Sequence, residues 1–124
     1  MIKISVDESF GYDLRTIAQI KFQKSGSEAA RKNLRRTSEE LVAQIDLATH
    51  EGILASQEYA DLKQANLDLF EIFDEMKRPD KTECFDLKAD RLNYLRHECK
   101  VALQKRFFPQ NPTTEIKLGY EKAQ

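Results

Sequence analysis

The sequence predicts an all-α fold made of antiparallel helical hairpins, with about four helices of which three are long. Apolar residues recur at steps of three and four through most of the chain, the period of helices that pack on one side. Charged residues make up 33% of the 124 positions, and there are only four Gly and three Pro. Short links between periodic stretches favour antiparallel neighbours. The length suffices for one domain with a modest core, so we expect residues 1–124 to form a single helical domain.

The first part of the chain predicts an extended arm followed by a helix. Residues 1–5 (MIKIS) alternate apolar and polar side chains, as an extended segment does. Ser5 and Glu8 have the spacing of a capping box, so we expect the first helix to begin near Val6. It should end at Lys24, because the Ser-Gly-Ser that follows interrupts the pattern.

A second helix is predicted from Ser27, a good N-cap, to about Glu51, with Gly52 as its stop. Its apolar positions are Leu34, Leu41, Ile45 and Ala48. The solvent face carries basic residues early and acidic residues later. The basic ones are Arg31, Lys32, Arg35 and Arg36, and the acidic ones are Glu39 and Glu40.

The third predicted helix, residues 56–78, is the element around which we expect the rest of the chain to be organised. Ser56 is a suitable N-cap, and Pro79 prevents the helix from continuing. Its apolar stripe is as narrow as the seam of a coiled coil. The stripe consists of Tyr59, Leu62, Asn66, Leu69, Phe73 and Met76.

The fourth predicted helix begins after a cap at Asp80 or Thr82, ends at about Phe107, and packs against the third. Its stripe contains Phe85, Leu92, Leu95, Cys99 and Ala102.

Residues 109–124 predict a non-helical tail, because they hold two prolines and no helical period. Within the tail, residues 115–120 alternate apolar and polar side chains. We expect this segment to lie on the helical body or to pair with residues 1–5 as a small β-ribbon.

The totals limit the class of partner and the compartment. Twenty basic and twenty-one acidic residues leave a net charge of −1, so no global field attracts nucleic acid or an anionic membrane. No apolar run could span a bilayer, and no secretory pattern is present, so we expect a cytoplasmic protein. Cys84 and Cys99 lie in one predicted helix, roughly 22 Å apart, and are therefore expected to be free thiols in a reducing compartment.

Asn66 is the polar residue on the apolar stripe of the third helix. A buried amide without partners costs roughly 1–3 kcal/mol, so it must bond to something. It either fixes the register of the packed helices or contacts a ligand.

Further polar residues of the third and fourth helices are candidates for the same site. Asn93, Arg96 and Lys100 share one helical face and could meet carboxylates of the third helix, as surface ion pairs or as a site for an anionic ligand. The carboxylates are those of Glu71, Asp74 and Glu75.

Two alternative chemistries remain open. Glu71 and Asp74 form an E-x-x-D step, which can hold Mg²⁺ together with substrate phosphates. The step is similar to one in all-helical nucleoside triphosphate pyrophosphohydrolases, but their E-x-x-E step is missing here, because Ala43 follows Glu40 by three.

The basic cluster of the second helix is the other alternative. Its cations oppose the helix dipole, which points to an external anion such as a phosphate or an acidic partner surface, but a plain solvated face is the leading interpretation. No aromatic residue lies among them to stack on a base, which argues against nucleic acid. The cluster consists of Arg31, Lys32, Arg35 and Arg36.

Four segments of the chain resemble an uncharacterised family of small helical proteins from bacteria and tailed phages, a domain of unknown function. They are DLRTIAQIK (13–21), NLDLFEIFDEMK (66–77), NYLRHECK (93–100) and EIKLGY (115–120). The resemblance implies that the family's polar positions are Asp13, Lys21, Asn66, Glu71, Asp74, Asn93, Arg96, Lys100, Glu115 and Lys117. It implies no enzymatic activity.

The leading functional hypothesis is a non-enzymatic interaction or assembly protein that forms a homo-oligomer, with a dimer favoured. A thin helical body with apolar stripes on several faces cannot bury all of its apolar surface by itself, and it tends to bury the remainder against a partner. The sequence holds no Gly-rich phosphate loop and no nucleophile elbow, so no catalytic residue is predicted and no cofactor is expected. The alternatives are a Mg²⁺-dependent pyrophosphohydrolase and an anion-binding or nucleic-acid-binding protein.

Overall fold

The computed structural model describes residue 2, residues 4–77 and residues 85–113, without the side chains of residues 76, 85 and 86. The described residues form five helices and no strand, which confirms the all-α class. They are α1 (Glu8–Ser25), α2 (Glu28–Gln44), α3 (Leu47–Leu54), α4 (Gln57–Met76) and α5 (Phe85–Phe107). The predicted pairing of residues 115–120 and the predicted caps at Asp80 and Thr82 lie outside the described residues, as does Cys84.

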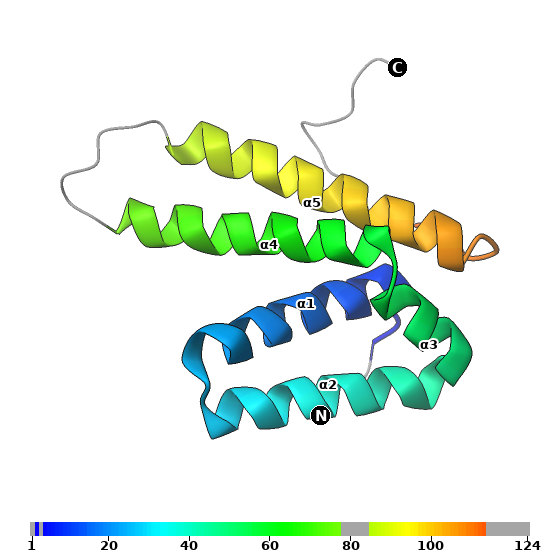
Figure 1. The fold of residues 1–124 in the computed structure, drawn as a ribbon. Helices are drawn as coiled ribbons and strands as arrows, with labels where there is room; N and C mark the ends of the chain where they lie inside the picture. The colour runs from blue at the N-terminus through cyan, green and yellow to red at the C-terminus, as the bar shows by residue number, and fades with distance from the viewer. Residues whose placement is uncertain (1, 3, 78–84, 114–124) are drawn as a thin grey trace, which may run out of the picture.

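Helix α1 lies in the middle of the molecule. Helices α4 and α5 run side by side in opposite directions and form the most extensive helix pair, as Figure 1 shows. Helix α1 packs against both of them on one side and against α2 on the other, while the short α3 connects α2 to α4. Helix α4, which was predicted to organise the fold, is therefore central together with α1.

Side-chain caps define three of the helix starts. Ser27 accepts a hydrogen bond from the backbone N–H of Ala30 (3.1 Å), and Ser56 accepts one from that of Tyr59 (3.1 Å), as predicted. Helix α1 ends at Gly26, whose φ of 62° places it in the left-handed region that favours glycine.

The predicted second helix proved to be two helices. Ile45 adopts an extended conformation, and the Asp46 side chain caps α3 by accepting bonds from the backbone N–H and the hydroxyl of Thr49 (both 2.9 Å). Gly52 lies inside α3 and does not end it. A local Asp-x-x-Thr cap thus ends a helix that the apolar period alone would continue.

The start of α1 also differs from its prediction. The helix begins at Glu8 after Asp7, and no side chain of its own caps it. Instead, Gln104 of α5 accepts a hydrogen bond from the backbone N–H of Ser9 (2.9 Å) and donates one to Glu8 (2.7 Å). A residue 95 positions away therefore satisfies the helix end that Ser5 was predicted to cap.

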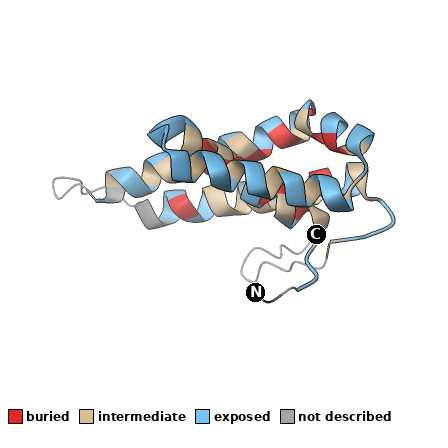
Figure 2. Ribbon diagram, turned by 90° about the horizontal axis from the view of Figure 1, so that it is seen from below, coloured by how far each residue is buried: buried red, intermediate tan, exposed pale blue. Residues whose placement is uncertain are grey.

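The apolar core lies where α1, α3, α4 and α5 meet, and Figure 2 shows the buried residues on the faces that these helices turn toward one another. Its buried members are Tyr12, Ile53, Tyr59, Leu62, Cys99 and Leu103. Several predicted stripe positions are exposed instead: Phe73 and Leu95 are each 46% exposed, and Ala48 and Ala102 are exposed as well. In the part of the chain that is described, no helix is both long enough and apolar enough to cross a membrane.

Cys99 belongs to this core, and its thiol is free and buried. Burial raises the pKa of the thiol to about 11, and the carboxylates of Asp61 and Glu98 add to the effect. Since the thiolate is the reactive species, we expect Cys99 to resist a disulfide reagent at pH 8 until the protein unfolds. Labelling of a Cys84→Ser variant with and without urea measures this. If the folded variant reacted as fast as the same variant unfolded in urea, this expectation would be wrong.

Candidate functional site

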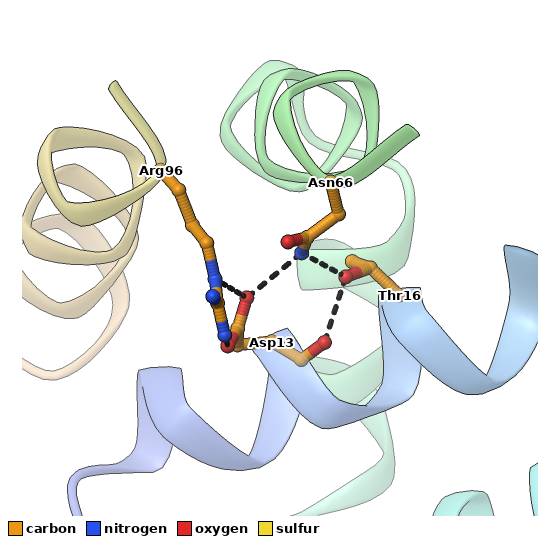
Figure 3. Close-up of polar contacts among 4 residues, drawn as sticks. All are labelled: Asp13, Thr16, Asn66 and Arg96. Atoms are coloured by element: carbon orange, nitrogen blue, oxygen red, sulfur yellow. Dashed lines mark hydrogen bonds and ion pairs between the residues drawn. The ribbon is translucent and has the colours of Figure 1, made fainter. Parts of the chain in front are cut away.

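The candidate site is built around Asp13, a carboxylate on α1 that is fully buried. It is joined by Thr16 of the same helix, Asn66 of α4 and Arg96 of α5, as Figure 3 shows. We call these four residues the Asp13 cluster. They connect three helices through side chains separated by up to 83 positions in the sequence.

The Asn66 amide faces α1. Its Nδ2 donates to Asp13 Oδ1 (2.8 Å) and to Thr16 Oγ1 (2.7 Å). Thr16 in turn donates to the Asp13 carbonyl oxygen (2.7 Å). Because a carboxylate only accepts, the amide nitrogen must be the atom turned toward Asp13, which fixes the orientation of the side chain.

Arg96 supplies the positive charge that balances Asp13. Its Nε donates to Asp13 Oδ1 (3.0 Å) and Oδ2 (3.2 Å), and its Nη2 forms a short ion pair with Oδ2. This fork geometry suits arginine, which can bind both oxygens at once. A buried carboxylate with a bidentate partner avoids the several kcal/mol that an isolated buried charge costs.

The Asp13 cluster corrects one sequence expectation. Glu71, Asp74 and Glu75 were predicted to face the polar residues of α5, but Arg96 binds α1 instead. Glu71 and Asp74 are exposed, and the partner of Asp74 among the described residues is Lys77, in an ion pair of 3.9 Å. Asn66 is buried as expected, but the described partners of its side chain belong to α1 rather than α5.

A hollow of about 310 Å³ opens beside the cluster, between α1, α4 and α5. Its polar lining consists of Lys21, Asn66, Asn93 and Arg96. Its apolar lining consists of Ile17, Leu69, Phe70 and Phe73. Three of the predicted polar residues, Asn66, Asn93 and Arg96, therefore share one concave surface.

Lys100, the last residue of the predicted polar set, is buried elsewhere. Its Nζ lies 5.9 Å from the centre of the Phe10 ring, a distance at which an ammonium and an aromatic face attract. It does not line the hollow. The set predicted from the third and fourth helices therefore divides into three places.

The two carboxylates of the E-x-x-D step, Glu71 and Asp74, lie on the surface of α4. Among residues 2, 4–77 and 85–113, no group of three or more His, Cys, Asp or Glu side chains could hold one. Glu71 and Asp74 are not part of such a group in the described residues, and the Mg²⁺ alternative stays a hypothesis.

The basic cluster of α2 lies on the surface. Arg31 pairs with Glu28 in the preceding turn (2.5 Å between Nη2 and Oε1), and Arg36 donates to Asn33 (3.2 Å). Lys32 and Arg35 are exposed. None of the 17 residues of α2 is buried.

A second concave surface separates α2 from the start of α1. This α1–α2 groove has a volume of about 410 Å³. Its floor includes Gly11, Leu14, Leu41 and Ile45, and its carboxylates are Asp7, Glu8, Glu40 and Asp46. No lysine or arginine is among the described residues that line it. The groove is therefore apolar at its floor and negative at its rim.

A third polar group joins Tyr12 to His50, whose Nδ1 lies 2.7 Å from the Tyr12 hydroxyl oxygen. Burial of His50 lowers its pKa below 6.5, Arg15 acts in the same direction, and Glu51 opposes them. The unfolded chain therefore binds the proton first as the pH falls. The stability that neutral His50 contributes is complete above pH 6.5 and decreases below it.

A pH series tests this expectation. Below pH 6.5, the free energy of unfolding of the unsubstituted protein should decrease relative to that of the His50→Gln variant. Glutamine does not titrate, and its side-chain oxygen can still accept a hydrogen bond from Tyr12. Urea unfolding at several pH values gives the difference. A difference that stays constant through this range would contradict the assignment.

Reasoning from the residues alone missed Asp13 and Thr16. Both lie on the first predicted helix among ordinary polar positions, and their partners on α4 and α5 are fifty or more positions away. The family resemblance did include Asp13 and Lys21. Comparison with protein-family models, with characterised proteins and with solved structures found no match to this chain. Membership of the resembled family therefore stays a prediction.

Proposed function

We propose that this chain is a non-enzymatic helical interaction protein that acts as a homodimer, paired through α1 and α2. The observation that supports the proposal is the division of charge along this pair of helices. The basic end of α2 carries four cations, while the α1–α2 groove at the other end carries four carboxylates and no described cation.

The exposed apolar surface of this layer supports pairing. Leu14 is 47% exposed and Val42 is 38% exposed, and α2 contributes no buried residue to the chain's own core. Covering such side chains gains about 25 cal/mol for each Å² removed from water. A partner over α2 would therefore bury apolar surface that the monomer leaves in solvent.

A second copy of the chain fits this charge pattern. In a twofold pairing, the basic end of one α2 lies against the groove of its partner, and the reverse contact forms by symmetry. Both contacts join opposite charges, and the assembly closes at two copies. The four cations near the start of α2, which oppose the helix dipole, would then face carboxylates of the partner.

Charge reversal tests the pairing. The variant Arg35→Glu with Arg36→Glu makes the basic end negative, and Glu39→Lys with Glu40→Lys makes the other half positive. All four side chains are exposed, so we expect both variants to fold. Each should weaken dimerisation by about tenfold or more, since like charges then face each other. Light scattering after size-exclusion chromatography measures the oligomeric state of each variant.

Mixing the two variants is the decisive step. Each contact in the mixed dimer again joins opposite charges, so a heterodimer should form at concentrations where each variant alone is monomeric. Arg91→Glu with Lys105→Glu has the same charge change on exposed positions of α5 and should dimerise normally. A native protein that is monomeric at tens of micromolar, or a mixture that stays monomeric, would refute the proposal.

The test also separates pairing from binding of an external anion. If the basic end served phosphate or nucleic acid alone, reversal of Arg35 and Arg36 would remove that binding, and mixing would produce no heterodimer. Raised salt should weaken the proposed dimer, because the charges at its rim are screened over about 8–10 Å.

A further inference from the structure

We infer that the hollow beside the Asp13 cluster binds a small aromatic carboxylate that carries one hydrogen-bond donor at the far end of its ring. The volume of about 310 Å³ is at the lower end of the range for small-molecule sites, and apolar side chains with a few converging polar groups are typical of such sites. Its lining residues differ from those of the α1–α2 groove, so this inference is independent of dimerisation.

The floor of the hollow offers an acceptor. Asn66 is 2% exposed and turns its Nδ2 to Asp13 and Thr16, and its Oδ1 points sideways, toward the side of α5 (Figure 3). No donor among the described residues reaches this oxygen. Every fully buried side-chain nitrogen or oxygen of the described residues has a hydrogen-bond partner. The Asn66 oxygen must therefore contact accessible space, and the hollow that Asn66 lines provides it.

The charge of the lining favours an anion. Lys21 and Arg96 are its two ionisable residues, and both are cations. The charge of Arg96 is balanced by Asp13, which does not line the hollow. The charge of the exposed Lys21 is therefore the one in the lining that no described carboxylate balances. In the described part of the chain, neither the Lys21 ammonium nor the Asn93 amide has a polar partner. A carboxylate bound in the hollow would supply the acceptor that these two donors lack.

The walls favour a flat apolar body. Phe70 and Phe73 are three positions apart on α4, and Phe73 remains 46% exposed although it belongs to the apolar stripe. An aromatic ring between the mouth and the floor would cover both faces and gain the offset stacking that aromatic pairs prefer. The ligand then needs a hydroxyl or ring N–H at its inner end to donate to Asn66.

A titration of the ¹⁵N-labelled full chain with 4-hydroxyphenylacetate tests the inference. We expect a dissociation constant of about 1 mM, as for other ligands of this size, and shifts confined to the lining residues and the Asn66 and Asn93 side-chain amides. Phenylacetate lacks the inner donor and 4-hydroxyphenylacetamide lacks the charge. Each should bind about fivefold or more weakly, because one polar group of the site is then left without its partner.

Two variants separate this site from general anion binding. Lys21→Met should weaken 4-hydroxyphenylacetate binding about fivefold or more, while Lys24→Met, on an exposed position of the same helix outside the lining, should leave it unchanged. Absence of shifts at 10-fold the expected dissociation constant would overturn the inference. Equal binding of phenylacetate, or shifts centred on Arg31, Lys32, Arg35 and Arg36, would overturn it as well.

Discussion

Replacing Asp13 with alanine is expected to lower the free energy of unfolding by about 3–5 kcal/mol. The substitution removes the carboxylate that accepts from Asn66 and Arg96, so the partly buried guanidinium loses its bidentate ion pair with α1. Of the two described partners of the Asn66 amide, Thr16 remains. Urea unfolding followed by the helical circular-dichroism signal measures the loss.

Asp74→Ala is the matched control, since the same residue type is removed from an exposed position of α4. The loss there should be below about 0.5 kcal/mol. A double variant, Asp13→Leu with Arg96→Met, should recover part of the loss, because apolar residues can replace a buried ion pair without leaving a lone charge. A loss below about 1 kcal/mol for Asp13→Ala would show that the cluster is not formed in solution.

Leu62→Ala is expected to cost about 2–5 kcal/mol. Leu62 is fully buried in the core that α1, α4 and α5 share, so truncation removes apolar contacts and leaves a cavity that neighbouring helices fill only in part. The same substitution at Leu95, which is 46% exposed on α5, should cost less than about 1 kcal/mol.

Comparison of the two leucines also tests which face of α5 is buried. The sequence pattern placed both Leu95 and Cys99 in the seam, whereas the structure buries Cys99 together with Ala89 and Leu103 and leaves Leu95 exposed. Equal losses at Leu62 and Leu95 would contradict the observed packing.

Local signals account for the features that the sequence predicted well. Ser27 and Ser56 are followed by periodic apolar residues, and each caps its helix as expected. Pro109 allows α5 to end at Phe107, and Gly26 ends α1 one residue beyond the predicted position. Each of these signals acts within a few residues, so it can be read without knowledge of the tertiary structure.

Features that depend on distant residues were not predictable in the same way. The cap of α1 comes from Gln104, and the partner of Arg96 is Asp13. The sequence identified Asn66 and Arg96 as polar residues on helical faces, but it could not tell that both faces turn toward α1. The break at Asp46 was missed for a different reason, since a local cap competes there with an uninterrupted apolar period.

The residues that the family resemblance grouped are only partly together. Asp13, Lys21, Asn66, Asn93 and Arg96 gather around the hollow and its floor. Glu71 and Asp74 are exposed on α4, and Lys100 lies against Phe10. The proposed ligand site and the proposed dimer contact use lining residues that do not overlap, so a dimer paired through α2 would leave the hollow open.

Hydrogen exchange of the Asn66 side-chain amide tests the Asp13 cluster most directly. Both protons on its Nδ2 are donated to buried acceptors, whereas the Asn33 side chain is exposed on α2 and serves as the control. We predict that the Asn66 amide signals persist far longer in D₂O than those of Asn33 and show nuclear Overhauser contacts to Thr16. Exchange of Asn66 as fast as that of Asn33 would contradict the cluster that joins α1 to α4 and α5.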